Sequence, residues 1–333
     1  MSLYSGNMKE KLIMSGMRPT GRLHLGHLAG VVDNWLKFQD EGKCYFEIAD
    51  WHSLTDRTDN SELQGNVMEM VTDWLAIDID PQKSTLFVQS LVPEHAELYT
   101  LFSMITPITW ATHCPVFKDK TQGEDAIKNP SLGLLNYPVL QAADIALYKG
   151  THVPVGEDQA PHVELSRKII RRFNSLYGNL FPEPETILTK TPRIMGFDGR
   201  KMSKSLDNHL APYHSQEELI LRTGKMITDP QKIRKNDPGR PEICSVYAVH
   251  DVYNPNRGTV ESECKSGTRG CVSCKKELAG VLYDMFEGFR EKRAFYEAKP
   301  QEVREILYEG SKTAREVAKR TIEEVREAMK VKF

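Results

Sequence analysis

The chain has 333 residues, of which 40% are hydrophobic and 27% are charged, and its formal net charge is −2. This composition is typical of a globular protein large enough for two domains, and it excludes a protein that binds nucleic acid through its overall charge. No apolar run approaches the roughly 20 residues that span a membrane, and the first residues lack the apolar core of a signal peptide, so we expect a cytoplasmic protein with no membrane contact.

Short apolar strands alternate with amphipathic helices in the first half of the chain. Strands are predicted over residues 11–16, 44–52 and 84–90, and helices over residues 27–42, 61–77 and 94–105. This alternation predicts a parallel sheet with right-handed crossovers, in which ligands bind at the carboxyl ends of the strands. From about residue 205 the pattern is mainly helical. We therefore expect an α/β fold with a parallel-sheet domain over residues 1–205 and a helical domain over residues 206–333.

The first motif, GRLHLGH, follows the first predicted strand and opens the first helix. His24 and His27 are three residues apart, so their side chains point to nearly the same side of a helix. A metal site would need further ligands, and no HExxH or comparable pattern lies nearby. Gly21 and Gly26 would instead let an anion approach the free N–H groups of the helix N-terminus. On these residues alone, the alternatives are an anion-binding pair and two partly exposed histidines.

The second motif is GRKMSKSLDN, in which three cations and two serines follow Gly199. By itself the motif predicts either a solvated surface turn or a mobile loop that binds phosphates through lysine. The five-letter string KMSKS, which spans Lys201 to Ser205, is highly specific when an HxGH motif precedes it in the same chain. The two motifs together therefore favour a phosphate-binding site.

This pair of motifs resembles the signatures of class I aminoacyl-tRNA synthetases, with HLGH in place of HIGH and KMSKS intact. The stretch from Gly133 to Asn174 resembles bacterial tryptophanyl-tRNA synthetases along its whole length, as do RPTGRLHLGH, ADWHSLT and TDPQKIRKNDPGRPE. The resemblance implies a Rossmann-type catalytic domain over residues 1–205, a helical anticodon-binding domain over residues 206–333, and a homodimer. It implies a tryptophan–tRNA ligase that forms tryptophanyl-adenylate from L-tryptophan and ATP with Mg²⁺, releases pyrophosphate and charges tRNA(Trp).

The resemblance also implies roles for individual residues around ATP. The expected catalytic residues, which stabilise the charge on the phosphates, are His24, His27, Lys201, Lys204 and, from a looser match of the FKDK stretch, Lys120. The further residues expected to contact ATP are Arg18, Pro19, Thr20, Gly26, Gly156, Glu157, Asp158, Ile194, Met202, Ser203 and Ser205.

In the tryptophan pocket, the resemblance places Asp144 where the family's carboxylate accepts the indole N–H. Indole has one donor and no acceptor, so an acceptor-only carboxylate suits it. The other residues expected to line the pocket are Met14, Tyr137, Gln141, Val153, Val155 and Gln159.

Three alternatives to a tryptophanyl enzyme remain. Tyr137, Gln141 and Asp144 form Y-x3-Q-x2-D, which tyrosyl-tRNA synthetases also carry, although VPVGEDQ at residues 153–159 is the tryptophanyl form. A non-catalytic synthetase-like RNA-binding protein is a second alternative. Such a protein would be expected to have lost the HxGH or the KMSKS motif, but both motifs are intact here. A different nucleotidyltransferase would not need the tryptophan-type pocket.

Four cysteines, Cys244, Cys264, Cys271 and Cys274, follow the pattern C-x19-C-x6-C-x2-C. In a cytoplasmic chain this grouping predicts a metal or redox site rather than disulfides. Thiolates of this kind hold either Zn²⁺ or a [4Fe–4S] cluster, and the spacing does not separate the two. A subset of bacterial tryptophanyl-tRNA synthetases resembles this arrangement and carries [4Fe–4S], so the cluster is the favoured expectation and zinc is the alternative.

Two smaller features complete the sequence. Cys44 and Cys114 are isolated, which favours buried, small apolar positions for them. The basic stretch that contains Lys232, Arg234 and Lys235 precedes the cysteine group, and we expect it to contact tRNA phosphates.

Overall fold

A five-stranded parallel sheet forms the centre of the computed structural model, which describes residues 11–55, 59–122, 126–156, 159–188 and 194–332. The strand order is β3-β2-β1-β4-β5, so the order reverses between β1 and β4. The strands are β1 (Leu12–Met17), β2 (Lys43–Ile48), β3 (Ser84–Val88), β4 (His152–Val155) and β5 (Glu185–Leu188). The predicted α/β class is thereby confirmed, and the β1–β4 switch marks the expected place for a ligand.

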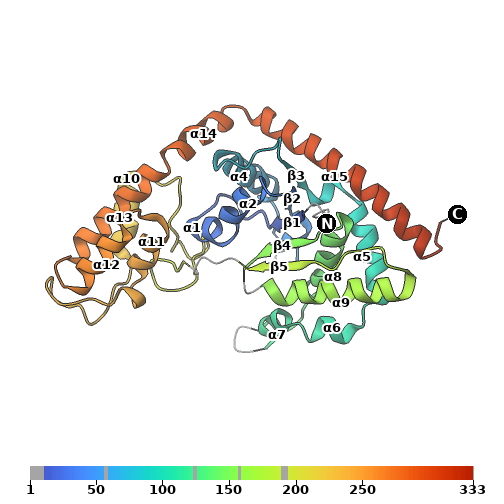
Figure 1. The fold of residues 1–333 in the computed structure, drawn as a ribbon, viewed down its shortest axis with the longest axis horizontal. Helices are drawn as coiled ribbons and strands as arrows, with labels where there is room; N and C mark the ends of the chain where they lie inside the picture. Colours follow the sequence, from blue (N-terminus) through green and yellow to red (C-terminus); the bar gives the residue numbers. More distant parts are fainter. Residues whose placement is uncertain (1–10, 56–58, 123–125, 157–158, 189–193, 333) are drawn as a thin grey trace, which may run out of the picture.

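Successive strand residues point to opposite faces of the sheet, and each face has its own apolar core. Ile13 and Phe46 pack with Trp35 and Trp74 on one face. Met14 on the other face packs among residues of the helices that cover that side. The first face is covered by α2 (Asp33–Phe38) and α4 (Leu63–Ala76), and the second by α5 (Glu94–Ile105), α8 (Leu132–Leu147) and α9 (Ala160–Tyr177). Figure 1 shows the sheet between these two layers.

The predicted elements differ from the observed ones mainly at their ends. The helix predicted over residues 27–42 consists of α1 (Leu25–His27), a π-helical turn over Leu28–Val32 and α2. The second predicted strand ends at Ile48, and the chain turns into the short helix α3 (Asp50–Ser53). Cys44 and Cys114 are buried, as expected. The remaining short helices of this half are α6 (Ile108–Thr112) and α7 (Pro115–Thr121).

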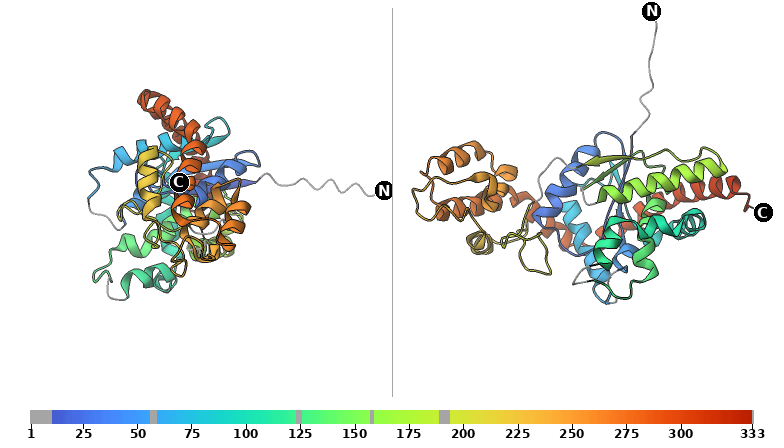
Figure 2. Two further views of the ribbon diagram at one scale, coloured as in Figure 1. Left: turned by 90° about the vertical axis from the view of Figure 1, so that its left-hand side faces the viewer. Right: turned by 90° about the horizontal axis from the view of Figure 1, so that it is seen from below.

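The second part of the chain is helical, as predicted. Four helices gather at one end of the molecule (Figures 1 and 2): α10 (Gln216–Lys225), α11 (Ser245–Tyr253), α12 (Arg257–Lys265) and α13 (Cys271–Met285). From there α14 (Glu287–Glu297) and α15 (Pro300–Ala328) run back to the sheet. Among the described residues, no helix is long and apolar enough to cross a membrane.

Helix α15 packs directly on the edge strand β3. A Cβ at Gly310 would collide with the Leu86 carbonyl oxygen, so only glycine allows this approach. The next residue, Ser311, accepts the Val88 N–H through its hydroxyl oxygen at 3.1 Å. The apolar side of this helix, which includes Ala314 and Ile322, is buried in the second core. The helix therefore covers an edge that would otherwise present free backbone groups.

Candidate active site

Glycine shapes the loop that follows β1. Gly21 has a φ of +85°, in the left-handed region that disfavours other residues. A Cβ at this position would lie 2.8 Å from the Asn66 Oδ1 atom and 3.5 Å from the Lys204 Nζ atom. The chain then enters α1, where the Leu25 N–H donates to the Leu210 carbonyl oxygen at 2.8 Å. The loop is therefore held against a segment that lies far away in the sequence.

His24 and His27 stack on each other at the start of α1. Their ring centroids are 3.7 Å apart and their planes are inclined by 19°. Burial, and then the proximity of His27, His209 and Lys204, lowers the pKa of His24 to about 2. Burial, followed by the charges of Lys204 and Lys201, lowers the pKa of His27 to about 3. Both imidazoles are therefore neutral near pH 7 and each can donate an N–H to an anion, while the lysines supply charge.

The KMSKS loop contacts this histidine pair directly. The Lys204 ammonium donates to the carbonyl oxygens of Thr20 and, at 2.6 Å, Arg22. A Cβ at Gly26 would lie 3.0 Å from the His24 ring and 3.7 Å from the Met202 Cβ atom. The backbone at Gly26 therefore lies between the two motifs, where a side chain would fill the gap. The HLGH and KMSKS motifs, which lie some 180 residues apart in the sequence, are therefore in contact, as predicted.

Asn208 fixes the shape of the KMSKS loop. Its side-chain oxygen accepts the Ser203 N–H at 2.7 Å. Its side-chain nitrogen donates to Asp198 at 2.7 Å and to the Lys201 carbonyl oxygen at 3.1 Å. Asn208 is fully buried, so these bonds are shielded from water. Sequence reasoning assigned it no role, although it closes the motif GRKMSKSLDN.

The other residues expected to contact ATP differ in burial and in position. Pro19 is buried, Arg18 is exposed, and Ile194 and Met202 are buried in the same core as the start of α1. Glu157 and Asp158 lie outside the described residues. The remaining placements are Gly156 after β4, and Ser203 and Ser205, whose hydroxyl oxygens are 2.8 Å apart.

Lys120 is not brought to the motif loops. It belongs to α7, which lies apart from α1, below α8 and α9 in Figure 1. Its carbonyl oxygen accepts the Ile127 N–H at 2.9 Å, a contact that concerns the backbone only. The expected contact between Lys120 and the triphosphate stays a prediction.

Asp144 lies on α8 with both carboxylate oxygens engaged. Its Oδ1 atom accepts from Gln89 at 2.9 Å and from the His95 Nδ1 atom at 2.6 Å, and its Oδ2 atom is 2.8 Å from the His52 Nε2 atom. Burial alone would raise the pKa of Asp144, but the hydrogen bonds from His52 and His95 outweigh it and lower the pKa to about 2. A carboxylate has about four lone-pair sites, so three donors leave room for one more.

A second buried carboxyl group lies behind this network. Glu47 on β2 is 3.7 Å from the His95 Nδ1 atom, and its Oε1 atom has no hydrogen-bond partner among the described residues. Burial, together with the negative charge of Asp144, raises the pKa of Glu47 well above its usual value. Glu47 therefore keeps its proton to a higher pH than an exposed glutamate does. The other ring nitrogen of His95 is 2.8 Å from the Tyr148 hydroxyl oxygen, which fixes the orientation of the ring.

Tyr137 and Gln159, two residues of the expected tryptophan pocket, are linked through His162. The Tyr137 hydroxyl oxygen is 2.8 Å from the His162 Nε2 atom, and the Gln159 Oε1 atom is 2.9 Å from its Nδ1 atom. Met14 and Val153 are buried in the core of the same sheet face. The remaining expected residues are Gln141, which is half-buried on α8, and Val155, which ends β4.

A hollow of about 280 Å³ opens beside Tyr137. In the described part of the chain, Tyr137 is the one expected pocket residue that lines it, and the other lining residues are Trp51, Leu54, Thr55, Ala96, Tyr99, Gly133, Asn136 and Leu140. The lining is mostly apolar and aromatic, as is usual in small-molecule sites. His52 lies between the lining residues Trp51 and Leu54 in the sequence. Its hydrogen bond to Asp144 connects the lining of the hollow to that carboxylate.

Comparison with known proteins decides the family. Residues 7–287 match the model of the class I tRNA synthetases for W and Y. The chain is 45% identical to the tryptophan–tRNA ligase of Aquifex aeolicus and 46% identical to that of Thermotoga maritima, with 95% and 96% of this chain and 99% of each relative covered. The chain belongs to the bacterial tryptophanyl-tRNA synthetases of class I. The tryptophanyl-tRNA synthetase of Campylobacter jejuni, solved with ADP and tryptophan, shares the fold with a TM-score of 0.83 and 31% identity over 96% of this chain and 99% of that one.

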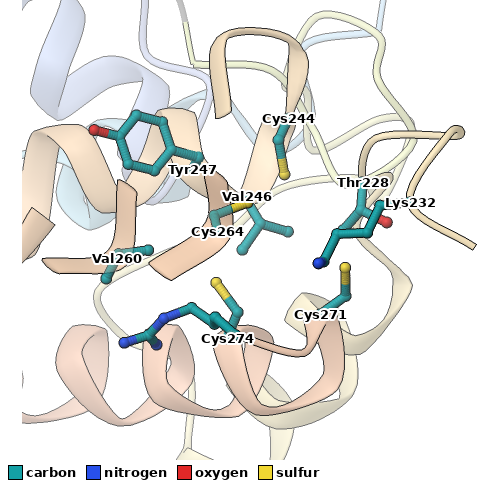
Figure 3. Close-up of a pocket in the computed structure, with 10 residues that line it drawn as sticks. Thr228, Lys232, Cys244, Val246, Tyr247, Val260, Cys264, Cys271 and Cys274 are labelled. Atoms are coloured by element: carbon teal, nitrogen blue, oxygen red, sulfur yellow. The ribbon is translucent and has the colours of Figure 1, made fainter. Parts of the chain in front are cut away.

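The structure also brings together the four cysteines of this tryptophanyl-tRNA synthetase. Cys244 precedes α11, Cys264 lies on α12, and Cys271 and Cys274 occupy the first turn of α13. All four line one small pocket, and Figure 3 shows their sulfur atoms around a shared space with the Lys232 ammonium beside it. Burial raises the pKa of Cys274 to about 12, so a bound cation would be needed to keep this thiol ionised.

The spacing of the sulfur atoms bears on the kind of metal. In the described part of the chain, three metal-binding atoms come within 4.8 Å of one another only at Glu47, His95 and Asp144, whose contacts are those of a hydrogen-bonded network. The cysteine sulfurs are therefore more widely spread. Tetrahedral zinc with Zn–S bonds of about 2.3 Å would bring four sulfurs to roughly 3.8 Å from one another. A cluster that offers a separate iron to each thiolate accepts a wider spacing.

Proposed function

We propose that the chain is a tryptophan–tRNA ligase that converts L-tryptophan and ATP to tryptophanyl-adenylate and pyrophosphate, and then transfers tryptophan to tRNA(Trp). The observation that carries this proposal is the contact of the KMSKS loop with the HLGH loop, in which the Lys204 ammonium reaches the carbonyl oxygens of Thr20 and Arg22. This contact lies beyond the carboxyl end of β1, next to the point where the strand order reverses.

The chemistry requires positioning and charge stabilisation rather than an acid–base side chain. The tryptophan carboxylate attacks the α-phosphate, and pyrophosphate leaves on the opposite side. Neutral His24 and His27 would donate N–H groups to phosphate oxygens, and Lys201 and Lys204 would neutralise the developing charge. Mg²⁺ would arrive with ATP and lower the negative charge of the phosphates. The Lys204 ammonium, which now donates to two carbonyl oxygens, would exchange these for phosphate oxygens.

ATP–pyrophosphate exchange with tryptophan and tyrosine side by side tests this function. Tryptophan should support exchange and tyrosine should not, because VPVGEDQ at residues 153–159 is the tryptophanyl form and the relatives at 45% and 46% identity are tryptophan–tRNA ligases. Exchange that depends on tyrosine would favour the tyrosyl alternative. Absence of exchange with any amino acid would favour a non-catalytic RNA-binding protein.

We further propose that the helical region from residue 206 onward binds the tRNA anticodon. Arg234 and Lys235 are exposed and suit phosphate contacts. Lys232 does not suit them, contrary to our expectation, because it is buried and its ammonium donates to the carbonyl oxygens of Asp237 and, at 3.2 Å, Lys235. It holds the basic loop in shape beside the cysteines.

We propose that Cys244, Cys264, Cys271 and Cys274 hold a [4Fe–4S] cluster. The resemblance of the cysteine pattern to the cluster-bearing subset of the family favours this choice over zinc. The positive charges of Lys232 and Arg269, which line the same pocket, would offset the net negative charge of a cluster bound by four thiolates. The cluster would order the segment between α11 and α13 and take no part in adenylate formation.

Anaerobic purification tests the cluster. The protein should be brown, absorb near 400 nm and contain about four irons per chain. Cys271→Ser should lose most of the iron, whereas Cys114→Ser, at a buried cysteine outside the group, should keep it. Colourless protein with one zinc per chain would contradict the cluster and leave the zinc alternative.

We also propose that two chains pair. Large apolar side chains are exposed on three helices of the sheet domain, where Met104 on α5, Ile108 on α6 and Leu132 on α8 are 74%, 68% and 76% exposed. Large exposed apolar side chains are candidates for a surface that a partner covers. Sedimentation equilibrium should give about twice the chain mass of 37.9 kDa, and Ile108→Lys should shift the protein to a single chain.

A further inference from the structure

The backbone segment that carries His24 is held by one side chain of the sheet domain and one of the helical region. Leu23, directly before His24, donates its N–H to the Asp73 Oδ2 atom at 2.5 Å. The Leu25 carbonyl oxygen, directly after it, accepts from the Tyr253 hydroxyl at 3.3 Å. His24 therefore sits between two backbone anchors, and each anchor involves a side chain outside the ATP site.

Asp73 is in turn fixed by Arg293. Asp73 lies on α4 and is completely buried, and its second oxygen, Oδ1, accepts from the Arg293 guanidinium. Arg293 comes from α14, is only 2% exposed, and also pairs with Glu69 and, at 3.0 Å, with Glu297. The two oxygens of one carboxylate thus join a helix of the helical region to the backbone next to His24.

A purely structural role does not account well for this arrangement. A buried ion pair gains little net stability over an apolar contact of the same volume, because both charges must leave water. An apolar residue at position 73 would, however, leave the Leu23 N–H without its acceptor. Arg293 keeps the carboxylate in one orientation, so that one oxygen always faces Leu23. This makes geometry at Leu23 the better explanation for the pair.

We propose that Asp73, oriented by Arg293, is a positioning residue for ATP that holds the Leu23–His24 backbone where the His24 imidazole can meet a phosphate. The inference rests on the proposed function. Neither side chain touches substrate, and both act through the backbone. Displacement of a positioned group by about 1 Å can cost about 100-fold in rate, so loss of this anchor should affect ATP use and leave tryptophan binding unchanged.

The first experiment compares Asp73→Asn/Arg293→Met with the wild type and with Arg326→Met. The double variant leaves no unpaired buried charge, so it should fold. Arg326→Met is the control because it also removes an arginine that pairs the C-terminal helices with the sheet domain, through Glu97 at 2.6 Å. The number of tryptophan-binding sites is measured by equilibrium dialysis. ATP–pyrophosphate exchange is measured at pH 8, where Asp73 is ionised even though burial raises its pKa to about 6.

Per tryptophan site, the double variant should lose about 10- to 100-fold in kcat/KM for ATP, with the Kd for tryptophan within about twofold of the wild type. The control should match the wild type in both. A double variant with wild-type kcat/KM for ATP and only a lower Tm would overturn the inference. Wild-type protein without tryptophan-dependent exchange would instead contradict the proposed function, so the two failures are distinguishable.

A second comparison isolates the bond to Leu23. Asp73→Asn keeps an oxygen that can accept the Leu23 N–H, whereas Asp73→Leu, of similar volume, does not. The leucine variant should therefore lose at least several-fold more in kcat/KM for ATP per site than the asparagine variant. Equal losses would contradict a role for this acceptor.

Discussion

Replacing Lys204 by alanine should lower the rate of tryptophan-dependent ATP–pyrophosphate exchange by about 10³-fold. Lys204 is the cation that joins the two motif loops, since its ammonium donates to the carbonyl oxygens of Thr20 and Arg22. Its removal takes away both the charge that would stabilise the leaving pyrophosphate and the contact that closes the loops. Because tryptophan is bound elsewhere, its Kd should stay within about twofold.

Lys275→Ala is the matched control for this prediction. The Lys275 ammonium also donates to a backbone carbonyl oxygen, that of Gly224 at 3.0 Å, but it does so in the helical region. Exchange in the absence of tRNA should be unchanged in this variant. If Lys204→Ala weakened tryptophan binding as much as it slowed exchange, a specific role in the transition state would be excluded.

Asp144→Asn should reduce kcat/KM for tryptophan by about 10²- to 10³-fold. The amide replaces one acceptor oxygen by a donor NH₂ in a network where Gln89, His52 and His95 all face the carboxylate. At least one buried donor is then left without an acceptor, which costs about 1–3 kcal/mol. The indole N–H also loses a charged acceptor, which accounts for about 1.5–3 kcal/mol more. The KM for ATP should change little, since the phosphate-binding loops are separate.

Asp229→Asn serves as the control for loss of a buried carboxylate. Asp229 is 4% exposed and pairs with Arg240 at 2.7 Å in the helical region, so its replacement should lower stability and leave tryptophan use unchanged. The measurement is exchange as a function of tryptophan concentration at saturating ATP. Wild-type tryptophan activation in Asp144→Asn would show that the indole is read by another group.

The sequence predicted those features that local patterns encode. Alternating strands and helices gave the parallel sheet, and two short motifs gave a phosphate site whose halves the structure places in contact. The environment of Asp144 could not be predicted, because His52, Gln89 and His95 come from different elements and meet only in the folded chain. The burial of Lys232 was missed for a similar reason, since a basic stretch is indistinguishable from a solvated one until its loop folds.

The contact of α15 with β3 determines when the sheet domain can finish folding during translation. Ser311 satisfies the Val88 N–H across 223 residues of chain, and Gly310 lies against the Leu86 carbonyl oxygen of the same strand. Contacts of such long sequence separation form late, and during translation the N-terminal part of a chain emerges first. The outer edge of the sheet therefore stays open while the ribosome makes the helical region. The sheet domain is completed only after Gly310 and Ser311 have left the ribosome.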